Sequence, residues 1–198
     1  MLSLKERLEL LERDLTARPI RIATYSDFPF AIFRYQPDEE WQMRREIRLL
    51  ATRVELHGLD VHRWSMGELM WESLAKSDVI DALVELEKRR GYEQAEEQAA
   101  TYLCDPDFVP VERLLAQRYE GLSSARDVVF LWRLGALAPN LLRVSGLTER
   151  LHSAGVALVP TVLFYPGGWQ GSLNYMGLRK DDEPLGSYRV KVYGRESS

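Results

Sequence analysis

The sequence predicts an α/β protein with three layers, a mostly parallel central sheet, a helical insertion and a C-terminal β-hairpin. Short runs of β-branched and aromatic residues alternate with amphipathic helical segments, the order of a βαβ protein. The run from residue 158 to 165 shows no polar alternation and stops at Pro166, Gly167 and Gly168, which is typical of a strand covered on both faces. The helical stretch after residue 66 is too long for a simple crossover, so it predicts an insertion.

The chain begins with a predicted amphipathic helix that ends before Pro19. Its apolar face consists of leucines at helical spacing: Leu4, Leu8, Leu11 and Leu15. Residues 31–35 then predict a short strand. Asp38 is suited to cap a long helix that ends at Gly58, and residues 59–64 supply a second strand. Strand, helix and strand in this order form a βαβ unit.

The helical insertion is expected at about 66–122, and the third and fourth strands at 127–133 and 156–165. Pro139 is suited to the first turn of a helix between those strands, which would reach His152. In the tail, residues 173–178 and 188–193 are short apolar segments separated by a charged loop. They predict the C-terminal hairpin at an edge of the sheet.

Composition indicates one ordinary globular domain over residues 1–198. Hydrophobic residues make up 45% and charged residues 28%, and the formal net charge is −4, so no overall positive field attracts nucleic acid or anionic membrane. The single cysteine, Cys104, excludes an internal disulfide. No apolar stretch approaches the roughly 20 residues that span a bilayer, and the charged N-terminus does not look like a signal peptide. We therefore expect a cytoplasmic protein.

The familiar signatures of a reaction centre do not occur. Neither glycine turn, 134–137 or 166–169, has the lysine of a phosphate-binding loop. The histidines His57, His62 and His152 are not spaced as a metal site, and Cys104 has no base near it in sequence. We accordingly expect no catalytic residue, no cofactor and no metal, and a protein that is not an enzyme.

The arginines suggest a surface that binds a partner. Arg133 follows the third strand and Arg143 begins the next helix, so both are expected at the carboxyl edge of the sheet with Gly167 and Gly168. The guanidinium of an arginine can bind a carboxylate through two parallel hydrogen bonds, and an exposed tryptophan is a common interface anchor. Trp169 follows two glycines and is expected to be exposed. The alternative is a set of surface salt bridges. The other tryptophans are expected in the core: Trp41, Trp64, Trp71 and Trp132.

Several segments together carry a family resemblance. In chain order they are 30–35 (Phe-Ala-Ile-Phe-Arg-Tyr), 37–40, 44–47, 69–72, 129–139 (Val-Phe-Leu-Trp-Arg-Leu-Gly-Ala-Leu-Ala-Pro), 142–147, 159–167 (Val-Pro-Thr-Val-Leu-Phe-Tyr-Pro-Gly) and 188–190. They resemble BrxB, a small component of BREX bacteriophage-exclusion systems. The resemblance spans nearly the whole chain, although residues 77–122 contribute little to it.

The resemblance implies a role in phage defence beside a DNA methyltransferase, a large ATPase and the phosphatase-like PglZ protein, with PglZ as the direct partner. It transfers no catalytic residue to this chain. Two other functions stay open from the residues alone. One is a degenerate nucleotide-binding domain, suggested by the strand–helix layout. The other is a nucleic-acid-binding module that uses the helix around residues 44–53.

Overall fold

A parallel sheet organises the chain in the computed structural model, which describes residues 2–22, 29–137, 147, 151, 159–169, 173–174 and 190–194. Within these residues, five strands form the sheet in the order β2-β3-β4-β1-β7, and every pairing is parallel. The strands are β1 (Phe30–Tyr35), β2 (Asp60–Ser65), β3 (Asp127–Trp132), β4 (Thr161–Pro166) and β7 (Lys191–Tyr193). The predicted parallel α/β class is confirmed.

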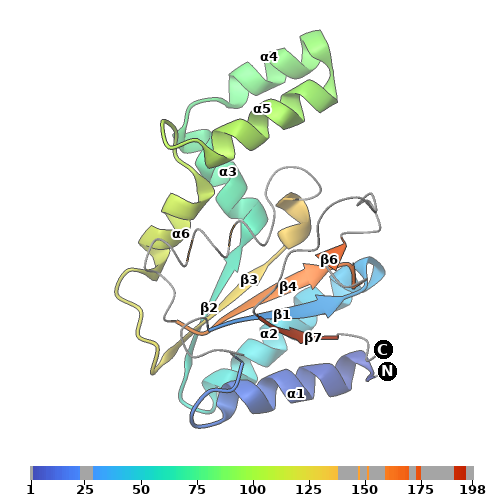
Figure 1. Ribbon diagram of the computed structural model, residues 1–198, viewed down its shortest axis with the longest axis vertical. Coiled ribbons are helices and arrows are strands. Elements are labelled where there is room, and N and C mark those ends of the chain that lie inside the picture. Colours follow the sequence, from blue (N-terminus) through green and yellow to red (C-terminus); the bar gives the residue numbers. More distant parts are fainter. Residues whose placement is uncertain are drawn as a thin grey trace.

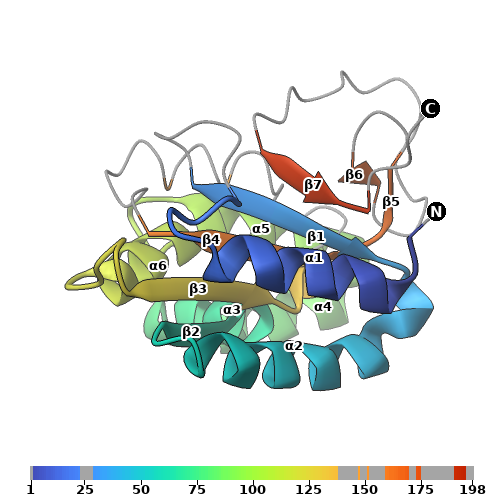
Figure 2. The same cartoon turned by 90° about the horizontal axis from the view of Figure 1, so that it is seen from below.

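Helices cover both faces of this sheet. The α-helices are α1 (Leu4–Thr16), α2 (Glu40–Glu55), α3 (Met66–Lys76), α4 (Ile80–Arg90), α5 (Tyr92–Cys104) and α6 (Val111–Tyr119); the 3-10 turns are η1 (Pro37–Glu39) and η2 (Leu134–Leu137). In Figure 2, α1 and α2 lie in front of the strands, with the helices α3 to α6 behind them. The described residues contain no helix of the length and apolar character that crosses a membrane.

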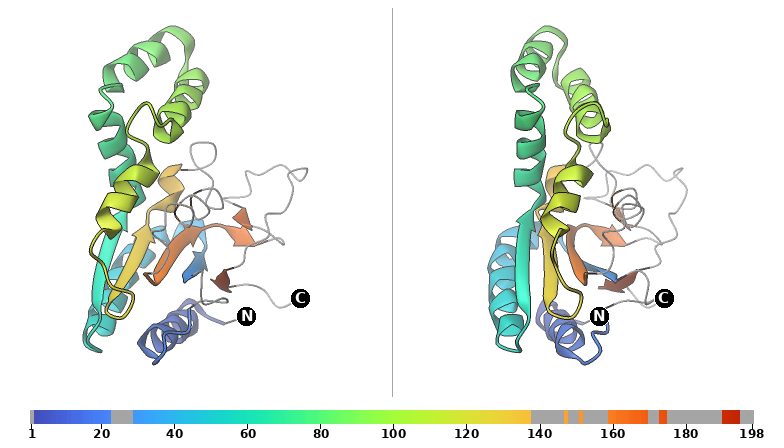
Figure 3. Two further views of the ribbon diagram at one scale, coloured as in Figure 1. Left: turned by 60° about the vertical axis from the view of Figure 1, so that its left-hand side comes forward. Right: turned by 90° about the vertical axis from the view of Figure 1, so that its left-hand side faces the viewer.

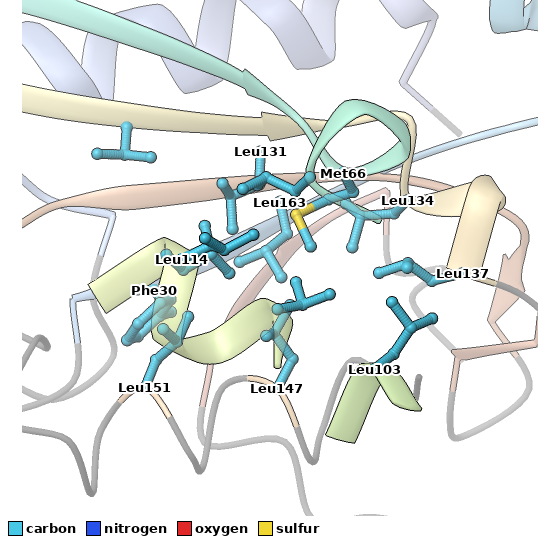
Figure 4. Packing of buried hydrophobic residues seen from close by; sticks show 14 of the residues in the cluster. Phe30, Met66, Leu103, Leu114, Leu131, Leu134, Leu137, Leu147, Leu151 and Leu163 are labelled. Carbon is cyan, nitrogen blue, oxygen red and sulfur yellow. The ribbon is translucent and has the colours of Figure 1, made fainter. Parts of the chain in front are cut away.

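The side chains of each central strand alternate between two cores. In β1, Phe30 and Ile32 pack under α3 and α6 and belong to the first core. Ala31 and Phe33 pack under α1 and α2 and belong to the second core. Every residue of β1 and β4 is buried. Figure 4 shows the first core, where Phe30 and Leu163 meet the helices. Burial on both faces explains why these strands show no polar alternation in sequence.

The helices α4 and α5 lie side by side and extend beyond the sheet, away from α1 (Figures 1 and 3). None of the residues of α4 is buried. In α5, Ala95 and Leu103 are buried, and Leu103 joins the first core. The hairpin of α4 and α5 is therefore held to the domain mainly through its base, and most of its surface faces solvent.

The strand order creates a switch point between β1 and β4. The chain leaves β1 to reach β2, on the far side of β4 and β3, whereas after β4 it reaches β7, on the far side of β1. Neighbouring strands whose connections run in opposite directions leave a crevice at their carboxyl ends. Open α/β sheets usually bind ligands there.

The described tail supplies the expected C-terminal strand, although the pairing differs from a simple hairpin. Strand β7 lies parallel to β1 at the sheet edge. Strand β6 (Leu173–Asn174) instead pairs antiparallel with β5 (Gly168–Trp169), which directly follows β4. Residues 175–178 and 188–189 of the predicted hairpin lie outside the described residues, as does most of the predicted helix 139–152, of which only Leu147 and Leu151 are described.

Three local expectations need correction. Asp38 does not cap α2, because η1 precedes that helix and places Glu39 at its N-cap position. The fourth strand begins at Thr161 rather than near residue 156. Trp41 and Trp71 are not core residues, since they are 77% and 57% exposed. Both tryptophans lie on the outer faces of helices whose leucines, isoleucines, methionines and valines already fill the core positions.

Phe130 offers a direct test of the second core. Its side chain is fully buried, and its ring meets that of Phe164 edge-on at a centroid distance of 5.2 Å. We expect Phe130→Ala to lower the free energy of unfolding by about 3–5 kcal/mol, because the lost ring leaves a cavity between sheet and helices. Urea denaturation measures this, with the exposed Trp71→Ala as the control. Similar midpoints for the two variants would contradict the assigned core.

Candidate functional site

The carboxyl ends of β1 and β4 meet at the switch point. The backbone N–H of Gly167, which follows β4, donates to the carbonyl of Tyr35 at 2.9 Å, so the pairing of the two strands continues into the turn. Beyond it, the chain enters η1 and α2 on one side and β5 on the other. The candidate site is built around this junction.

Arg34 connects three strand ends at the junction. It lies in β1 and is only 4% exposed. Its Nε donates to the carbonyl of Gly194, just after β7, at 3.0 Å, and its Nη1 donates to the carbonyl of Gly167 at 3.3 Å. A buried guanidinium is costly unless its donors are satisfied. Arg34 therefore stabilises the meeting of β1, β4 and β7.

A second guanidinium, that of Arg7 in α1, packs beside Arg34. Arg7 is 9% exposed, its Nη1 donates to the Arg34 carbonyl, and its Cζ lies 5.5 Å from the ring centre of Phe33. Burial lowers the pKa of Arg7, and the charge of Arg34 lowers it further, whereas the carboxylate of Glu39 opposes both effects. Within the described part of the chain, Arg7 Nε has no hydrogen-bond partner. Two cations are thus held together against backbone carbonyls.

Gly194 allows the two arginines to approach the end of β7. Its φ is +96°, in the left-handed region that favours glycine. A Cβ atom at this position would lie 2.8 Å from Arg7 Nη1 and 3.2 Å from the Arg34 carbonyl oxygen. The backbone of Gly194 therefore occupies space that a side chain would need.

The first turn of α2 extends the site toward solvent. The Tyr35 hydroxyl donates to the carboxylate of Glu40, whose other oxygen accepts from Arg44 Nε at 3.0 Å. The guanidinium carbon of Arg44 lies 4.4 Å from the ring centre of Trp41, a cation–π contact. Trp41 itself is 77% exposed. A chain of contacts thus runs from a buried strand end to an ordered aromatic ring at the surface.

The β1–α2 turn is unfavourable for a phosphate. A phosphate-binding loop places backbone N–H groups and a lysine at this point of the fold. Here the connection consists of Gln36 and the short η1, and the carboxylate of Glu39 accepts from the Gln36 N–H at 2.7 Å. Asp38 and Glu40 add further negative charge. These carboxylates place negative charge beside the start of α2, where a phosphate would have to bind, so this turn offers no support for nucleotide binding.

The predicted partner residues fall partly at this edge. Arg133 follows β3 with a φ of +57°, and its guanidinium packs on Gly67 of α3, where a Cβ atom would lie 3.3 Å from Arg133 Cζ. Gly167 follows the neighbouring strand β4, and Gly168 and Trp169 form β5, so all of these backbones follow the expected strand ends. Arg143 lies outside the described residues.

Sequence reasoning missed Arg34 and Arg7. The signal was present for Arg34, because it is the one charge in the buried run of residues 30–35. Such a charge must find partners at a strand end or in the core. Arg7 gave no comparable signal, because a charge between two leucines of an amphipathic helix is ordinarily solvated. Trp41 was missed because it was assigned to the core.

At the opposite edge of the sheet, β2 and β3 carry a second polar cluster. Asp60 and Asp127 are direct register partners, and like charges there repel. Arg126 Nε pairs with Asp60 at 2.7 Å, and His62 Nε2 lies 2.7 Å from Asp127 Oδ1. These residues line a pocket of about 690 Å³. Within the described chain, no group of three His, Cys, Asp or Glu side chains is arranged to hold a metal ion.

Asp127 is the buried anchor of that cluster. Its second oxygen accepts from the Ser123 backbone N–H at 2.8 Å. Burial alone would raise the pKa of Asp127, but the hydrogen bonds from His62 and Ser123 outweigh it and bring the pKa below its ordinary value of 3.8. The cluster has a structural explanation, since it neutralises two facing aspartates, and the carboxyl edge remains the better candidate site.

Comparison with known proteins gives one family. A family model described as BREX protein BrxB matches residues 62–191, which is more than half of the chain. The match covers β2 to the start of β7 and includes Arg133, Gly167 and Gly168. No curated protein and no solved structure matches the chain.

Two glycines with positive φ test the close packing at Arg34. Gly194→Ala introduces both backbone strain and a clash with Arg7, whereas Gly58→Ala, at a φ of +79° with no atom within 4 Å of the added Cβ, introduces the strain alone. Left-handed backbone costs a residue with a Cβ about 1–2 kcal/mol. We expect Gly194→Ala to lose clearly more stability than Gly58→Ala in urea denaturation. Equal losses would contradict the packing of Arg7 and Arg34 on Gly194.

Asp127 predicts a component of acid stability. Because its pKa is lowered by folding, the Asp127 carboxylate stabilises the fold above the ordinary pKa of 3.8, and that contribution is lost as the pH falls below this value. The urea midpoint of the wild type should fall as the pH drops below about 4, and it should fall less steeply in the Asp127→Asn variant. Asp60→Asn, which removes the more exposed register partner, is the matched control. If the urea midpoint of the Asp127→Asn variant falls with pH as steeply as that of the wild type, the assignment is wrong.

Proposed function

This chain belongs to the BrxB family and is thus a BREX defence component, and from that premise we propose that it is a non-catalytic subunit that binds other proteins of a cytoplasmic phage-defence complex. Family membership rests on the match over residues 62–191. The proposal adds the mode of action: the chain contributes a contact surface, and no reaction takes place on it.

The observation that carries the proposal is the exposed Trp41 in contact with Arg44. Its ring projects from the first turn of α2 at the carboxyl edge and is held by the Arg44 guanidinium. Glu40 in turn holds Arg44 and accepts from Tyr35 of the buried strand. Tryptophan and arginine are the residues most enriched among interface hot spots, and a preorganised ring loses little entropy on binding.

The polar groups at this edge support a contact role over a catalytic one. The guanidinium of Arg34 donates to backbone carbonyls, and the Glu40 carboxylate is engaged by Tyr35 and Arg44. Groups committed to such contacts hold the fold rigid and are poorly placed to exchange protons with a substrate. Rigid support under an exposed ring is instead what a protein interface requires.

We propose the PglZ phosphatase-like component as the partner, as the family resemblance implies. In this proposal Trp41 and Arg44 contribute to the contact from the α2 side of the carboxyl edge. The contact also includes the residues predicted from sequence, Arg133, Arg143, Gly167, Gly168 and Trp169, the last two of which follow β4 in β5. Arginine donors and tryptophan rings together recognise an apolar surface bordered by carboxylates.

Two exposed tryptophans allow a matched experiment. Trp41→Ala should weaken binding to the PglZ component roughly thirty-fold, because a central tryptophan contributes about 2 kcal/mol at an interface. Trp71→Ala, on α3 and 57% exposed, should bind nearly as the wild type does. The measurement is the Kd of the purified full-length chain for PglZ, with thermal melting to show that both variants are folded.

The outcomes separate the parts of the proposal. If the wild-type chain does not bind PglZ, that partner is wrong. If Trp71→Ala weakens binding and Trp41→Ala does not, the contact lies on α3 rather than on the α2 side of the carboxyl edge. ATP or phosphoester hydrolysis by the purified chain that disappears on substitution of one of its residues would overturn the non-catalytic role.

A further inference from the structure

The outward face of α2 is unusually apolar for a helix exposed to solvent. The inward face is buried against the sheet and consists of Met43, Ile47, Leu50, Ala51 and Val54. On the opposite side, Trp41 is 77%, Leu49 is 42% and Leu56, at the C-cap, is 81% exposed. Among the described residues, seven large apolar side chains are exposed, and three of them lie on this one helix. Such clustering marks an interaction site.

The same face carries unneutralised positive charge. Arg45 and Arg48 are exposed, and in the described part of the chain neither has a carboxylate within ion-pair distance. Arg44 pairs with Glu40, and Arg53, on the side toward α1, pairs with Glu12 of that helix at 2.6 Å. The chain as a whole carries a net charge of −4, so two free cations between apolar side chains are a local exception.

The neighbouring surface on the α1 side differs in chemistry. A groove of about 640 Å³ lies between α1 and α2, and its charged lining includes Glu9, Glu12 and Glu46. Lys5 and Arg53, also in the lining, already pair with Glu9 and Glu12. An acidic ligand is therefore repelled from the groove and attracted to the outward face of α2, which sets the position of a partner.

We propose that the α2 outer face, defined as Trp41, Arg45, Arg48, Leu49 and Leu56, binds an acidic amphipathic helix of another BREX protein. This inference rests on the proposed function and specifies the chemistry of the partner. From Trp41 to Leu56 the helix rises about 22 Å, which a partner helix of about 15 residues covers. The partner's apolar side chains contact Leu49, Leu56 and Trp41, and its carboxylates pair with Arg45 and Arg48.

A protein partner fits this face better than nucleic acid does. A phosphate backbone would use Arg45 and Arg48 but leave Leu49 and Leu56 in water. Glu55, beside Leu56, is also exposed, so the basic part of this face is confined to Arg45 and Arg48 and does not extend as a continuous track for a phosphate backbone. A face that combines apolar and basic side chains instead matches a helix whose apolar stripe is bordered by Asp and Glu.

The test is charge reversal in the tagged full-length chain, co-expressed with the other BREX proteins and captured in parallel with and without nuclease treatment. Arg45→Glu with Arg48→Glu should reduce the retained BREX protein at least ten-fold, because two attractive contacts become repulsive. The matched control is Arg89→Glu with Arg90→Glu, which makes the same charge change on exposed positions of α4 and should retain wild-type amounts. Thermal melting shows that both variants fold.

A third variant separates the two classes of partner. Leu56→Ser removes an apolar contact without changing charge, so it should also reduce retention several-fold if the partner is a protein helix. Loss of the retained BREX protein on nuclease treatment would overturn the inference in favour of nucleic acid. Wild-type retention by Leu56→Ser would also overturn it, because the contact would then lack its apolar part. Wild-type retention by the Arg45→Glu, Arg48→Glu variant would overturn it and leave the proposed function intact. If the wild-type chain retains no BREX protein, both fail.

Discussion

The hydrogen bonds of the Arg34 guanidinium hold the carboxyl edge of the sheet together. Through them, one side chain of β1 joins the turn after β4 and the end of β7, at the point where the strand order reverses. The positive charge is buried and its acceptors are backbone carbonyls, so the arrangement depends on accurate placement of three strand ends. Arg7 and Gly194 fit around it with almost no free space. A change to any of these contacts alters the carboxyl edge as a whole.

This arrangement explains why the switch point differs from an ordinary ligand crevice. In many doubly wound sheets the equivalent crevice stays open, and a helix N-terminus faces an anion. In this chain, the Arg34 guanidinium donates to the carbonyl of Gly167 at the strand ends, and Glu39 and Glu40 place negative charge beside the start of α2. Because the Arg34 guanidinium is engaged by backbone carbonyls and is almost fully buried, the exposed groups of this edge lie on α2.

Helix α2 links the core to the surface. Its inner residues close the second core, its first turn continues the contacts from Tyr35, and its outer face presents apolar and basic side chains. A rigid sheet beneath a helix keeps those side chains in place, which limits the entropy lost when a partner binds. Membership of the BrxB family makes the chain a BREX defence component, which is the biological setting of these features.

Local structure could be predicted from the amino-acid sequence, because hydrophobic periodicity and turn residues act over a few positions. Three examples are the burial of residues 161–165 on both faces, the amphipathic α1 and the helical region after residue 66. The sequence also placed Arg133 and Gly167 at strand ends. The tertiary structure alone decided the order of the strands, and with it the meeting of Arg7, Arg34 and Gly194. Those residues are far apart in the chain, and no local pattern encodes which strands become neighbours. For the same reason, only the packed helix showed that Trp41 points outward, since that depends on which side of α2 the sheet covers.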